Sequence, residues 1–582
     1  MKKFLTAFVF LLAFGGFNQS VHAAELSSLD ITTAITIAED DTQTVVQTVE
    51  AASTGDGVVR FPLPTKEANN LSVEIDGTAV EYDLEATQVQ RGPFTVDIVE
   101  VLFTPPSASW QAELSYDTTS LLGDGELKTI AVAALDYSTQ NVTEQVEITA
   151  PLTLGVPVAI GTQADDSSVG GGMQTYVFRF DEARTTSVLL DFATTQSYRL
   201  NWSEELKNTS FWWQTKQVVL APDTNQQVVH IEDISPKPTT IHLDTDGNII
   251  AMYNLGPKRS VKVEASAVAT VRSVRYAIDD DRGVDEVPGT LEAYVSQTGL
   301  WASGQEQTQD TAKATIETLY EAATEAASQT NSDSYLDVLN SFIADVRASG
   351  LPARLIAGTL THNGAQALEN PTQHYWAEVY LPGTGWMTAD PAMNTMYEQF
   401  GVSDGFHVAE FIRGIDSEKP PKNHNTVQLL ALNETPDLPD DFIPLVAQTK
   451  YLLLPGLSFT KTTITMLAGA VVDGVGYEDG GNAYRLGSLA PLQEMTRWRL
   501  ALGSASWGPS TVGVGLLQND AVDVVAEADS NLSFIPAIVL AVVVAASVYG
   551  FIVWRRKRKE PVRVHEADED IQVDAEDLLK KP

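Results

Sequence analysis

The stretch that decides the fold is DSYLDVLNSFIADVRASGLPARLIAGTL at 333–360, followed after a short insert by QHYWAEVYLPGTGWMTADP at 373–391. In its first half, apolar side chains recur at three- and four-residue steps, at Tyr335, Leu339, Phe342 and Val346. This spacing predicts an amphipathic helix. Gly350 and Pro352 are expected to end it, because Gly accepts the left-handed cap and Pro cannot continue the hydrogen-bond ladder. Strand-like runs follow at Arg354–Thr359, Tyr375–Leu381 and Trp386–Asp390.

The order of these segments and their residues resemble the transglutaminase-like family, whose core is a papain-like fold that uses a Cys, a His and an Asp. The matching pieces are Gly350-Leu-Pro-Ala-Arg354, His374-Tyr-Trp-Ala-Glu-Val-Tyr380, Gly385-Trp386 and Asp390-Pro391. The resemblance implies that His374 is the family's His and Asp390 its Asp. The family's nucleophilic Cys belongs fifteen residues before the Gly of the first piece, where this sequence has Tyr335.

The whole sequence contains no Cys, so the resemblance does not extend to thiol chemistry. A Tyr phenol titrates near ~10 and is a poor acyl acceptor. Because Tyr335 lies on the apolar stripe, we expect it to fill the place of the thiol. Ser334 is the alternative nucleophile, but a shift of one residue turns a helical side chain by about 100° away from His374. Ser334 and its neighbours Ser332 and Asp333 are better suited to capping the first turn.

Two interpretations of His374 and Asp390 therefore stay open. In the first, they form a buried hydrogen-bonded pair that locks the strands, and Trp376 and Trp386 are core aromatics. In the second, His374 is the base and Asp390 the orienting acid of an envelope enzyme for acyl transfer or peptide hydrolysis, with Ser334 or a water attacking. The first is favoured, because a triad without its nucleophile retains little catalysis. No cofactor and no metal site are predicted.

Both ends of the sequence carry targeting patterns. Met1-Lys-Lys, an apolar run and small residues up to Ala23 are typical of a signal peptide at 1–23. The run Phe534–Trp554 is almost unbroken apolar sequence, about the length that crosses a bilayer, and RRKRK follows at once. Basic residues stay on the cytoplasmic side. We expect one transmembrane helix at 534–554, the preceding chain outside and a cytoplasmic tail at 555–582.

The amino-acid composition limits which partners the protein can bind and in which cellular compartment it can lie. The 582 residues carry a formal charge of −40, which disfavours nucleic acid as a partner. An exported chain without Cys must be stable through its cores alone. This usage is ordinary in bacterial envelopes, so we expect a bacterial cell-surface protein that meets the membrane through one helix and has a protein or cell-wall ligand outside.

Most of the outer chain alternates apolar and polar residues, as strands do. We expect a β-sandwich at 24–124 and a second β-rich domain at 125–275. In the second, Asp244-Thr-Asp-Gly-Asn248 is either a calcium loop or a hairpin turn, and the turn is favoured because later calcium ligands are missing. Trp212-Trp213 is either a sugar-stacking surface or, as large aromatics usually are, part of a core.

Helical sequence is limited to about Gly289–Leu300 and Thr308–Ala327, ahead of the helix that Tyr335 begins. Together with Gly405–Gly414 as a last strand, these predict an α+β transglutaminase-like domain at 285–416. His407 in that strand is functional or, as is usual for a lone His, packed or on the surface. Strands return in a membrane-proximal β module at 425–530. The predicted fold class is therefore a multidomain, β-rich chain with one α+β domain.

Overall fold

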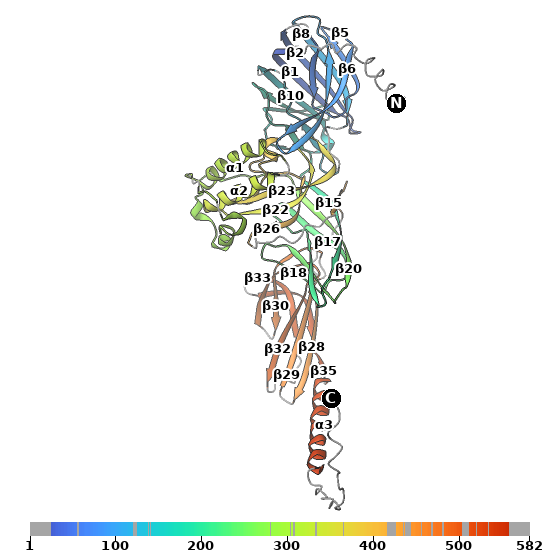
Figure 1. The fold of residues 1–582 in the computed structure, drawn as a ribbon, viewed down its shortest axis with the longest axis vertical. Coiled ribbons are helices and arrows are strands. Elements are labelled where there is room, and N and C mark those ends of the chain that lie inside the picture. Colours follow the sequence, from blue (N-terminus) through green and yellow to red (C-terminus); the bar gives the residue numbers. More distant parts are fainter. Residues whose placement is uncertain are drawn as a thin grey trace, which may run out of the picture. The chain divides into compact units, whose positions relative to one another are not determined.

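The computed structural model describes residues 25–54, 57–119, 121, 125–137, 139, 141–279, 281–302, 304–306, 309–331, 334–364, 366–415, 427–434, 436, 444–454, 457–466, 469–479, 482–502, 511–518, 521–533 and 535–557. The chain divides into two compact units, one made mainly of 1–442 and the other mainly of 443–582. Within each unit β structure dominates (Figure 1). The predicted signal peptide, most of the predicted cytoplasmic tail, and Ser332 and Asp333 lie outside the described residues.

The first β module is a sandwich that spans 25–191. Its eight-stranded sheet runs in the order β12-β13-β10-β1-β2-β8-β4-β5. The strands of that sheet are β1 (Glu25–Ile37), β2 (Gln43–Thr54), β4 (Asn69–Ile75), β5 (Thr78–Ala79), β8 (Ser109–Thr118), β10 (Val142–Pro151), β12 (Asp166–Gly170) and β13 (Met173–Phe180). Two three-stranded sheets share its core: β3 (Val59–Leu63), β6 (Tyr82–Arg91) and β7 (Phe94–Phe103); β9 (Thr129–Val132), β11 (Val158–Ile160) and β14 (Val188–Asp191).

This module is longer than the sequence suggested. β1 pairs in parallel with β10, with Ile31 opposite Glu144 and Ile35 opposite Ile148. Strands on both sides of residue 124 therefore belong to one sheet. Alternation marks each strand but not its partner, so sequence alone could not show that a strand beyond 124 completes the first sheet.

The second β module is built on two sheets around one core. One sheet contains β17 (Gln227–Ser235), β20 (Ser260–Arg272), β15 (Thr195–Lys207) and β27 (Val427–Ala431), in that order. The other contains β16 (Gln214–Leu220), β19 (Ile249–Leu255) and β18 (Thr240–Leu243). β27 was expected in the membrane-proximal module; instead it pairs with β15, Leu200 facing Leu429.

The α+β domain packs two helices on a four-stranded sheet of order β24-β23-β22-β26 (Figure 1). Its elements are α1 (Ala312–Ser328), α2 (Tyr335–Ala348), β22 (Ala353–His362), β23 (Ala367–Leu381), β24 (Gly385–Ala389) and β26 (His407–Arg413), and β25 (Val402–Ser403) pairs with β21 (Val274–Arg275). The helix predicted at Gly289–Leu300 is instead two 3₁₀ turns, Gly289–Tyr294 and Gly299–Trp301. Gly299 has a φ of +60°, which interrupts a continuous helix.

Helix α2 matches its prediction in register and in both ends. Tyr335 and Leu339 are buried on one face, and Gly350 follows the helix with a φ of +85°. Arg347, which is not part of the apolar stripe, is nevertheless only 1% exposed. Its guanidinium donates to the carbonyls of Ala353, Ser296 and Gly414 and lies 4.1 Å from the Trp301 ring. These carbonyls compensate its burial.

The α+β domain is hydrogen-bonded to the second β module. Asn248, in the turn between β18 and β19, donates to the Ile412 carbonyl at 2.7 Å and accepts the Ile412 amide at 2.7 Å. Asp246 accepts the amides of Gly414 and Ile415. β18 and β19 pair antiparallel on either side of this turn, which confirms the hairpin interpretation of Asp244–Asn248. The side chains of the turn bind strand β26 and the residues after it.

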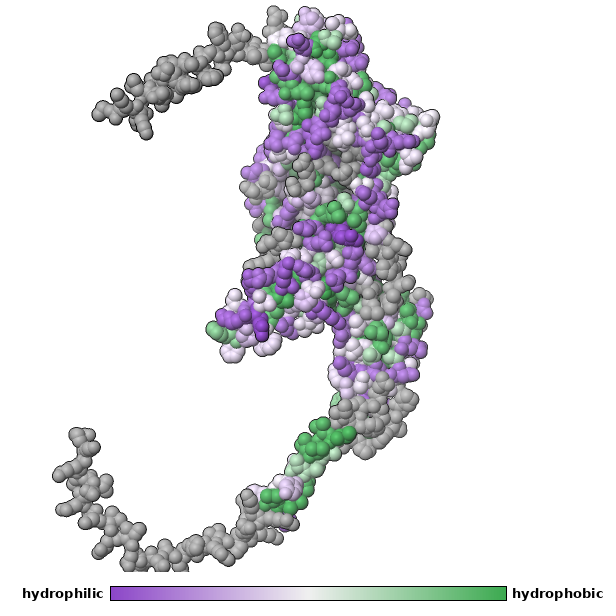
Figure 2. Space-filling model, turned by 90° about the vertical axis from the view of Figure 1, so that its right-hand side faces the viewer, coloured by the Kyte–Doolittle hydropathy of each residue, from purple (hydrophilic) through white to green (hydrophobic). Residues whose placement is uncertain are grey.

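The second unit contains two four-stranded sheets and a helix. The sheets run β32-β29-β28-β35 and β31-β30-β33-β34. Their bounds are β28 (Pro444–Leu454), β29 (Leu457–Met466), β30 (Val472–Asp479), β31 (Asn482–Leu489), β32 (Glu494–Leu502), β33 (Thr511–Gln518), β34 (Ala521–Asp529) and β35 (Asn531–Ser533). The helix is α3 (Ile535–Lys557), whose described side chains are largely hydrophobic (Figure 2). Searched over the described residues, the structure has no helix with the length and apolar character that crossing a membrane requires.

Candidate functional site

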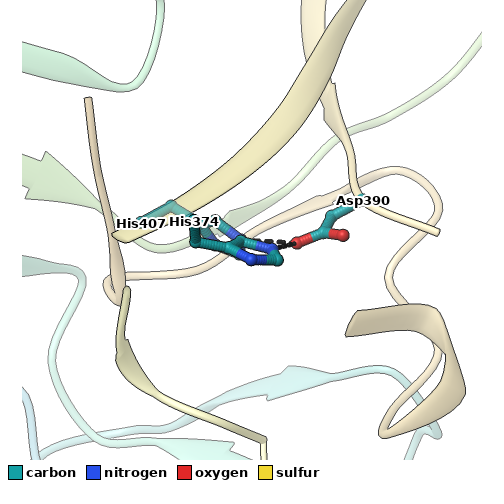
Figure 3. A group of neighbouring side chains, drawn as sticks. All are labelled: His374, Asp390 and His407. Carbon is teal, nitrogen blue, oxygen red and sulfur yellow. Dashed lines mark hydrogen bonds and ion pairs between the residues drawn. The ribbon is translucent and has the colours of Figure 1, made fainter. Parts of the chain in front are cut away.

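The candidate site is centred on the carboxylate of Asp390, which follows β24 directly. His374 reaches it from β23 and His407 from the start of β26 (Figure 3). Tyr335 reaches it from the first turn of α2. β23 and β26 pair with β22 on its two sides, so the two histidines that reach Asp390 come from the strands that flank β22. The sheet register thus brings together residues that are far apart in the chain.

The hydrogen bonds around Asp390 are short and converge on both carboxylate oxygens. Oδ2 lies 2.5 Å from His374 Nε2 and 3.0 Å from His407 Nε2. Oδ1 accepts the Tyr335 hydroxyl at 2.6 Å and the Ala392 amide at 3.0 Å. Asp390 is fully buried, so these donors replace the water that the carboxylate loses.

Tyr335, which the resemblance places where the family has its nucleophile, lies against His374 and Asp390. Its ring is parallel to the His374 ring, with an interplanar angle of 1° and centroids 5.6 Å apart. Burial, then the negative charge of Asp390, raises the pKa of the Tyr335 phenol well above its usual value. The phenol therefore stays protonated and acts as a hydrogen-bond donor.

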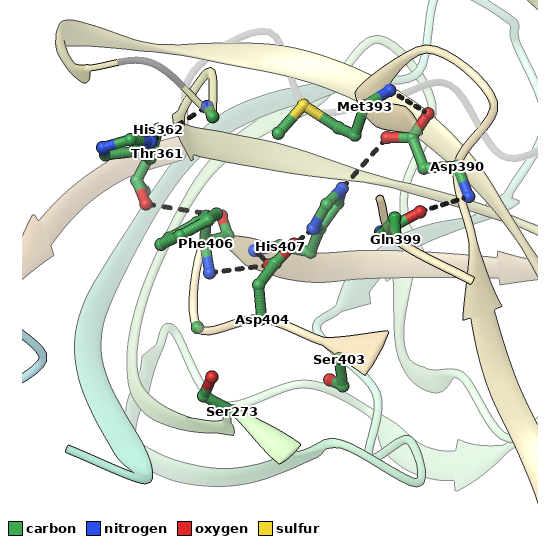
Figure 4. Close-up of polar contacts among 12 residues, drawn as sticks. Ser273, Thr361, His362, Asp390, Met393, Gln399, Ser403, Asp404, Phe406 and His407 are labelled. Carbon is green, nitrogen blue, oxygen red and sulfur yellow. Dashed lines mark hydrogen bonds and ion pairs between the residues drawn. The ribbon is translucent and has the colours of Figure 1, made fainter. Parts of the chain in front are cut away.

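His407 is a charged group inside the domain. Its Nδ1 lies 2.7 Å from Asp404 Oδ1 and its Nε2 3.0 Å from Asp390 Oδ2 (Figure 4). Carboxylate oxygens accept hydrogen bonds, so both ring nitrogens must carry protons and the ring is an imidazolium. Burial alone would lower the pKa of His407, but Asp404 and Asp390 outweigh it and raise the pKa to about 10.

The same contacts hold the two carboxyls ionised. Burial alone would raise the pKa of Asp390, but His374 and His407 outweigh it and keep that pKa well below its usual range. The pKa of Asp404 is likewise lowered, because His407 outweighs burial there too. The two buried carboxylates thus lie on either side of the buried His407 imidazolium.

Further residues fix Asp390 in place. The Gln399 side chain accepts the Asp390 amide at 2.7 Å, and the Tyr320 hydroxyl donates to the Asp390 carbonyl at 2.8 Å. Sequence reasoning missed Asp404, Tyr320 and Gln399, and it left His407 undecided. The available signal was Asp404-x-x-His407, a carboxylate placed to bond a histidine three residues later at the start of a strand.

Ser334, the alternative nucleophile, is exposed and precedes α2. In the described part of the chain its hydroxyl makes no capping bond to the helix, contrary to the expectation for it. Tyr335, the next residue, holds the place beside His374 instead.

Other residues of the matching pieces have structural contacts. Arg354 and Glu378 lie opposite each other on β22 and β23 and form a buried ion pair at 2.5 Å. Trp376 is 2% exposed and packs its edge on His407, over Gly358, where a Cβ would meet the indole at 2.5 Å. Trp386, expected in the core, is only half-buried and lies under the Arg354 guanidinium.

His374, Asp390 and His407 are also residue types that hold metal ions, and their ligand atoms lie within 4.8 Å of one another. Asp404 on His407 Nδ1 would support such a ligand. However, His407 Nε2 and His374 Nε2 already lie within hydrogen-bond distance of one Asp390 oxygen. A cation would have to displace these hydrogen bonds. In this structure the two histidines and Asp390 are hydrogen-bonded to one another.

Two cavities in the described part of the chain are lined by residues other than Trp376, Tyr335 and His374. One lies between the first β module and Met396, and the other lies on the first β module near Trp110.

Comparisons with solved structures give only distant likenesses. A provisionally named nutrient-binding protein from Legionella pneumophila is 10% identical, with a TM-score of 0.23, over 29% of this chain and 66% of its own length. An M1 zinc metallopeptidase from Deinococcus radiodurans is 12% identical, with a TM-score of 0.20, over 35% of this chain and 46% of its own. A provisionally named protease from Parabacteroides distasonis is 10% identical, with a TM-score of 0.21, over 83% of this chain and 93% of its own. At these TM-scores they carry no argument.

No curated protein matches the chain. A family match covers the part of the chain that contains α1, α2, β22, β23 and β24: the family described as the transglutaminase-like superfamily matches residues 305–391. That range includes Tyr335, His374 and Asp390, and the sequence has no Cys to serve as the nucleophile. The chain therefore contains a domain of the transglutaminase-like superfamily in which no cysteine is present.

Proposed function

We propose that this chain is an envelope scaffold protein whose transglutaminase-like domain has a structural or binding role and performs no acyl transfer. The observation that carries the proposal is the Tyr335 hydroxyl, 2.6 Å from Asp390, with its ring against His374. A permanently protonated phenol in the place of the thiol cannot provide the nucleophile that the family's chemistry needs. The amides of Ile412 and Gly414 donate to the Asn248 and Asp246 side chains, and these hydrogen bonds support a domain built into a larger scaffold.

The cell-surface location is part of the same proposal. The N-terminal pattern of a signal peptide and the basic RRKRK run after Trp554 support an outer chain held by segment 534–554. Exposed apolar side chains on α3, among them Val539, Val543 and Phe551, support lipid as their surroundings. We expect the full chain to stay with membranes after alkaline carbonate extraction, and a variant lacking 534–554 to be released. Release of the full chain would contradict the anchor.

Incubation with an amine donor, a glutamine-containing peptide and a serine-reactive probe tests the absence of catalysis. We expect no amine incorporation, no peptide hydrolysis and no labelling above a heat-denatured control. The matched variants are Ser334→Ala and His374→Ala, which remove the alternative nucleophile and the base. Labelling of the wild type that disappears in both variants would establish the enzyme alternative, with Ser334 attacking and His374 as base.

A further inference from the structure

One surface of the second β module differs from the rest of the chain. Phe211, Trp212 and Trp213, between β15 and β16, are 77%, 80% and 73% exposed. The expectation that these tryptophans fill a core is therefore wrong. Together with the adjoining connection between β19 and β20, they form what we call the aromatic tip, residues 207–216 and 254–260. Large exposed aromatic patches mark interaction sites.

The tip has the opposite charge balance to the whole protein. The chain has 37 Lys and Arg against 77 Asp and Glu, whereas residues 207–216 and 254–260 contain Lys207, Lys216, Lys258 and Arg259 and no acidic residue. Lys207 pairs with Glu205, just outside this range, at 2.7 Å, so the cationic character comes from the other three side chains. Lys258 lies 4.4 Å from the Phe211 ring centroid, so cation and aromatic ring are presented together. Such a surface attracts anions although the protein as a whole repels them.

The tip is held rigid from within. Asn208 is 2% exposed, and its side-chain amide donates to the Trp212 carbonyl at 2.7 Å and to the Leu255 carbonyl at 3.0 Å. The backbone amide of Asn208 donates to the Arg259 carbonyl at 2.8 Å, and the backbone amide of Lys258 donates to the Ser210 carbonyl at 3.2 Å. The two connections are thus joined, and the rings project from a fixed backbone.

This bonding bears on what the tip can bind. A backbone that enters a lipid interface must have its polar groups satisfied internally, and the amides and carbonyls of Ser210 and Trp212 are. A sugar site needs polar side chains free to bind hydroxyls, yet Asn208 and Ser210 are bonded within the tip. Trp is enriched at the boundary between lipid and water, and Lys and Arg attract anionic headgroups. These features favour a membrane over a glycan.

We propose that the aromatic tip docks on the surface of an anionic lipid bilayer, with its three rings in the headgroup region and its cations on lipid phosphates. This contact is separate from the proposed anchor at 534–554. It would hold the second β module against a membrane through side chains that have no role in the α+β domain.

Because the chain has no Cys, Thr209→Cys gives a single attachment point for an environment-sensitive fluorophore while all three rings stay in place. The full-length variant is reconstituted in phosphatidylcholine nanodiscs, so that the proposed anchor at 534–554 is already embedded in lipid and cannot insert into the added vesicles. Vesicles with and without phosphatidylglycerol, carrying a nitroxide-labelled lipid, are then added. We expect a blue shift and quenching with the anionic vesicles only. Val169→Cys, at a hairpin position that is 70% exposed in the first β module, is the matched control and is expected to show neither.

Two further variants in the labelled protein test the parts of the tip. Arg259→Gln is expected to weaken vesicle binding about fivefold, because one cation near an anionic surface contributes on the order of 1 kcal/mol. Trp212→Ser with Trp213→Ser is expected to abolish quenching while the melting temperature stays unchanged, since both indoles are exposed. Equal signals at Thr209 and Val169, or quenching that survives the Trp pair's removal, would overturn the proposal. A fluorescence change with soluble cell-wall glycan and none with vesicles would assign the tip to sugar binding instead.

Discussion

Replacing His407 by Leu is expected to lower the free energy of unfolding of the α+β domain by about 3–5 kcal/mol, the usual loss when one partner of a buried ion pair is removed. The variant would leave Asp390 and Asp404, both fully buried, without the cation between them. Hydrogen exchange of the amides in β22, β23 and β26 measures this loss locally, which suits a chain with several domains.

His362→Leu is the matched control. His362 is 4% exposed, stacks on Phe406 at 4.6 Å and accepts the Gly364 amide at 2.9 Å. Burial lowers its pKa to about 3, so it is a neutral histidine of similar burial. Its loss should cost about 1–3 kcal/mol, as for one unmade buried hydrogen bond. Equal losses in the two variants would contradict the charged role of His407.

The charge on His407 also sets a pH dependence. Its pKa is about 10 in the folded protein and about 6.5 in an unfolded chain. Because the folded state binds the proton more tightly, the stabilisation is complete below about pH 6.5 and is lost as the pH rises through about 10. Exchange in β26 should therefore accelerate across this window beyond its intrinsic increase in the wild type. A His407→Leu variant with the same slope would contradict this assignment.

The second large effect is expected at Tyr335. Tyr335→Ala should destabilise the α+β domain by about 3–5 kcal/mol, because it leaves a cavity against Leu339 and His374 and removes a buried donor. Tyr335→Phe keeps the ring and should cost about 1.5–3 kcal/mol, as expected for a hydrogen bond to a charged acceptor. Local hydrogen exchange in α2 and β23 measures both.

Tyr320→Phe is the control for Tyr335→Phe, because it removes a buried hydroxyl whose acceptor carries no charge. The Tyr320 side chain is as buried as that of Tyr335, but the two oxygens within reach of its hydroxyl proton, the Asp390 carbonyl and the Gln399 amide oxygen, are both neutral. Its removal should cost only about 0.5–1.5 kcal/mol. A larger loss at Tyr320 than at Tyr335 would show that the Tyr335 hydroxyl bond to Asp390 is not a main support of the site.

Local patterns predicted the elements of the transglutaminase-like domain well. The apolar stripe of α2 placed Tyr335 on the buried face, and the strand after Gly350 began within one residue of its expected start. The helical stripe and the strand start depend on residues close in sequence, whereas the contact between Tyr335 and His374 joins distant residues and was expected only from the resemblance.

The sequence did not show which strands from distant segments pair with each other. Nothing in the alternation of β1 or β15 shows that they pair with β10 and β27, because a strand's pattern reports which face is buried and not its neighbour. His407 reads as an ordinary strand residue until Asp404 and Asp390 are placed on either side of it. Trp212 and Trp213 read as core until their exposure is known.

The central claim is that position 335, and not 334, faces His374 as the family's nucleophile would. Since the chain has no Cys, Tyr335→Cys and Ser334→Cys each introduce one thiol, and the pH dependence of alkylation of each folded variant gives its pKa. We predict a thiol pKa clearly above ~8.5 for Tyr335→Cys, raised by the burial and the Asp390 charge that also raise the pKa of the phenol there, and one near ~8.5 for the exposed Ser334→Cys. The reverse order, with the raised pKa at position 334, would contradict the account.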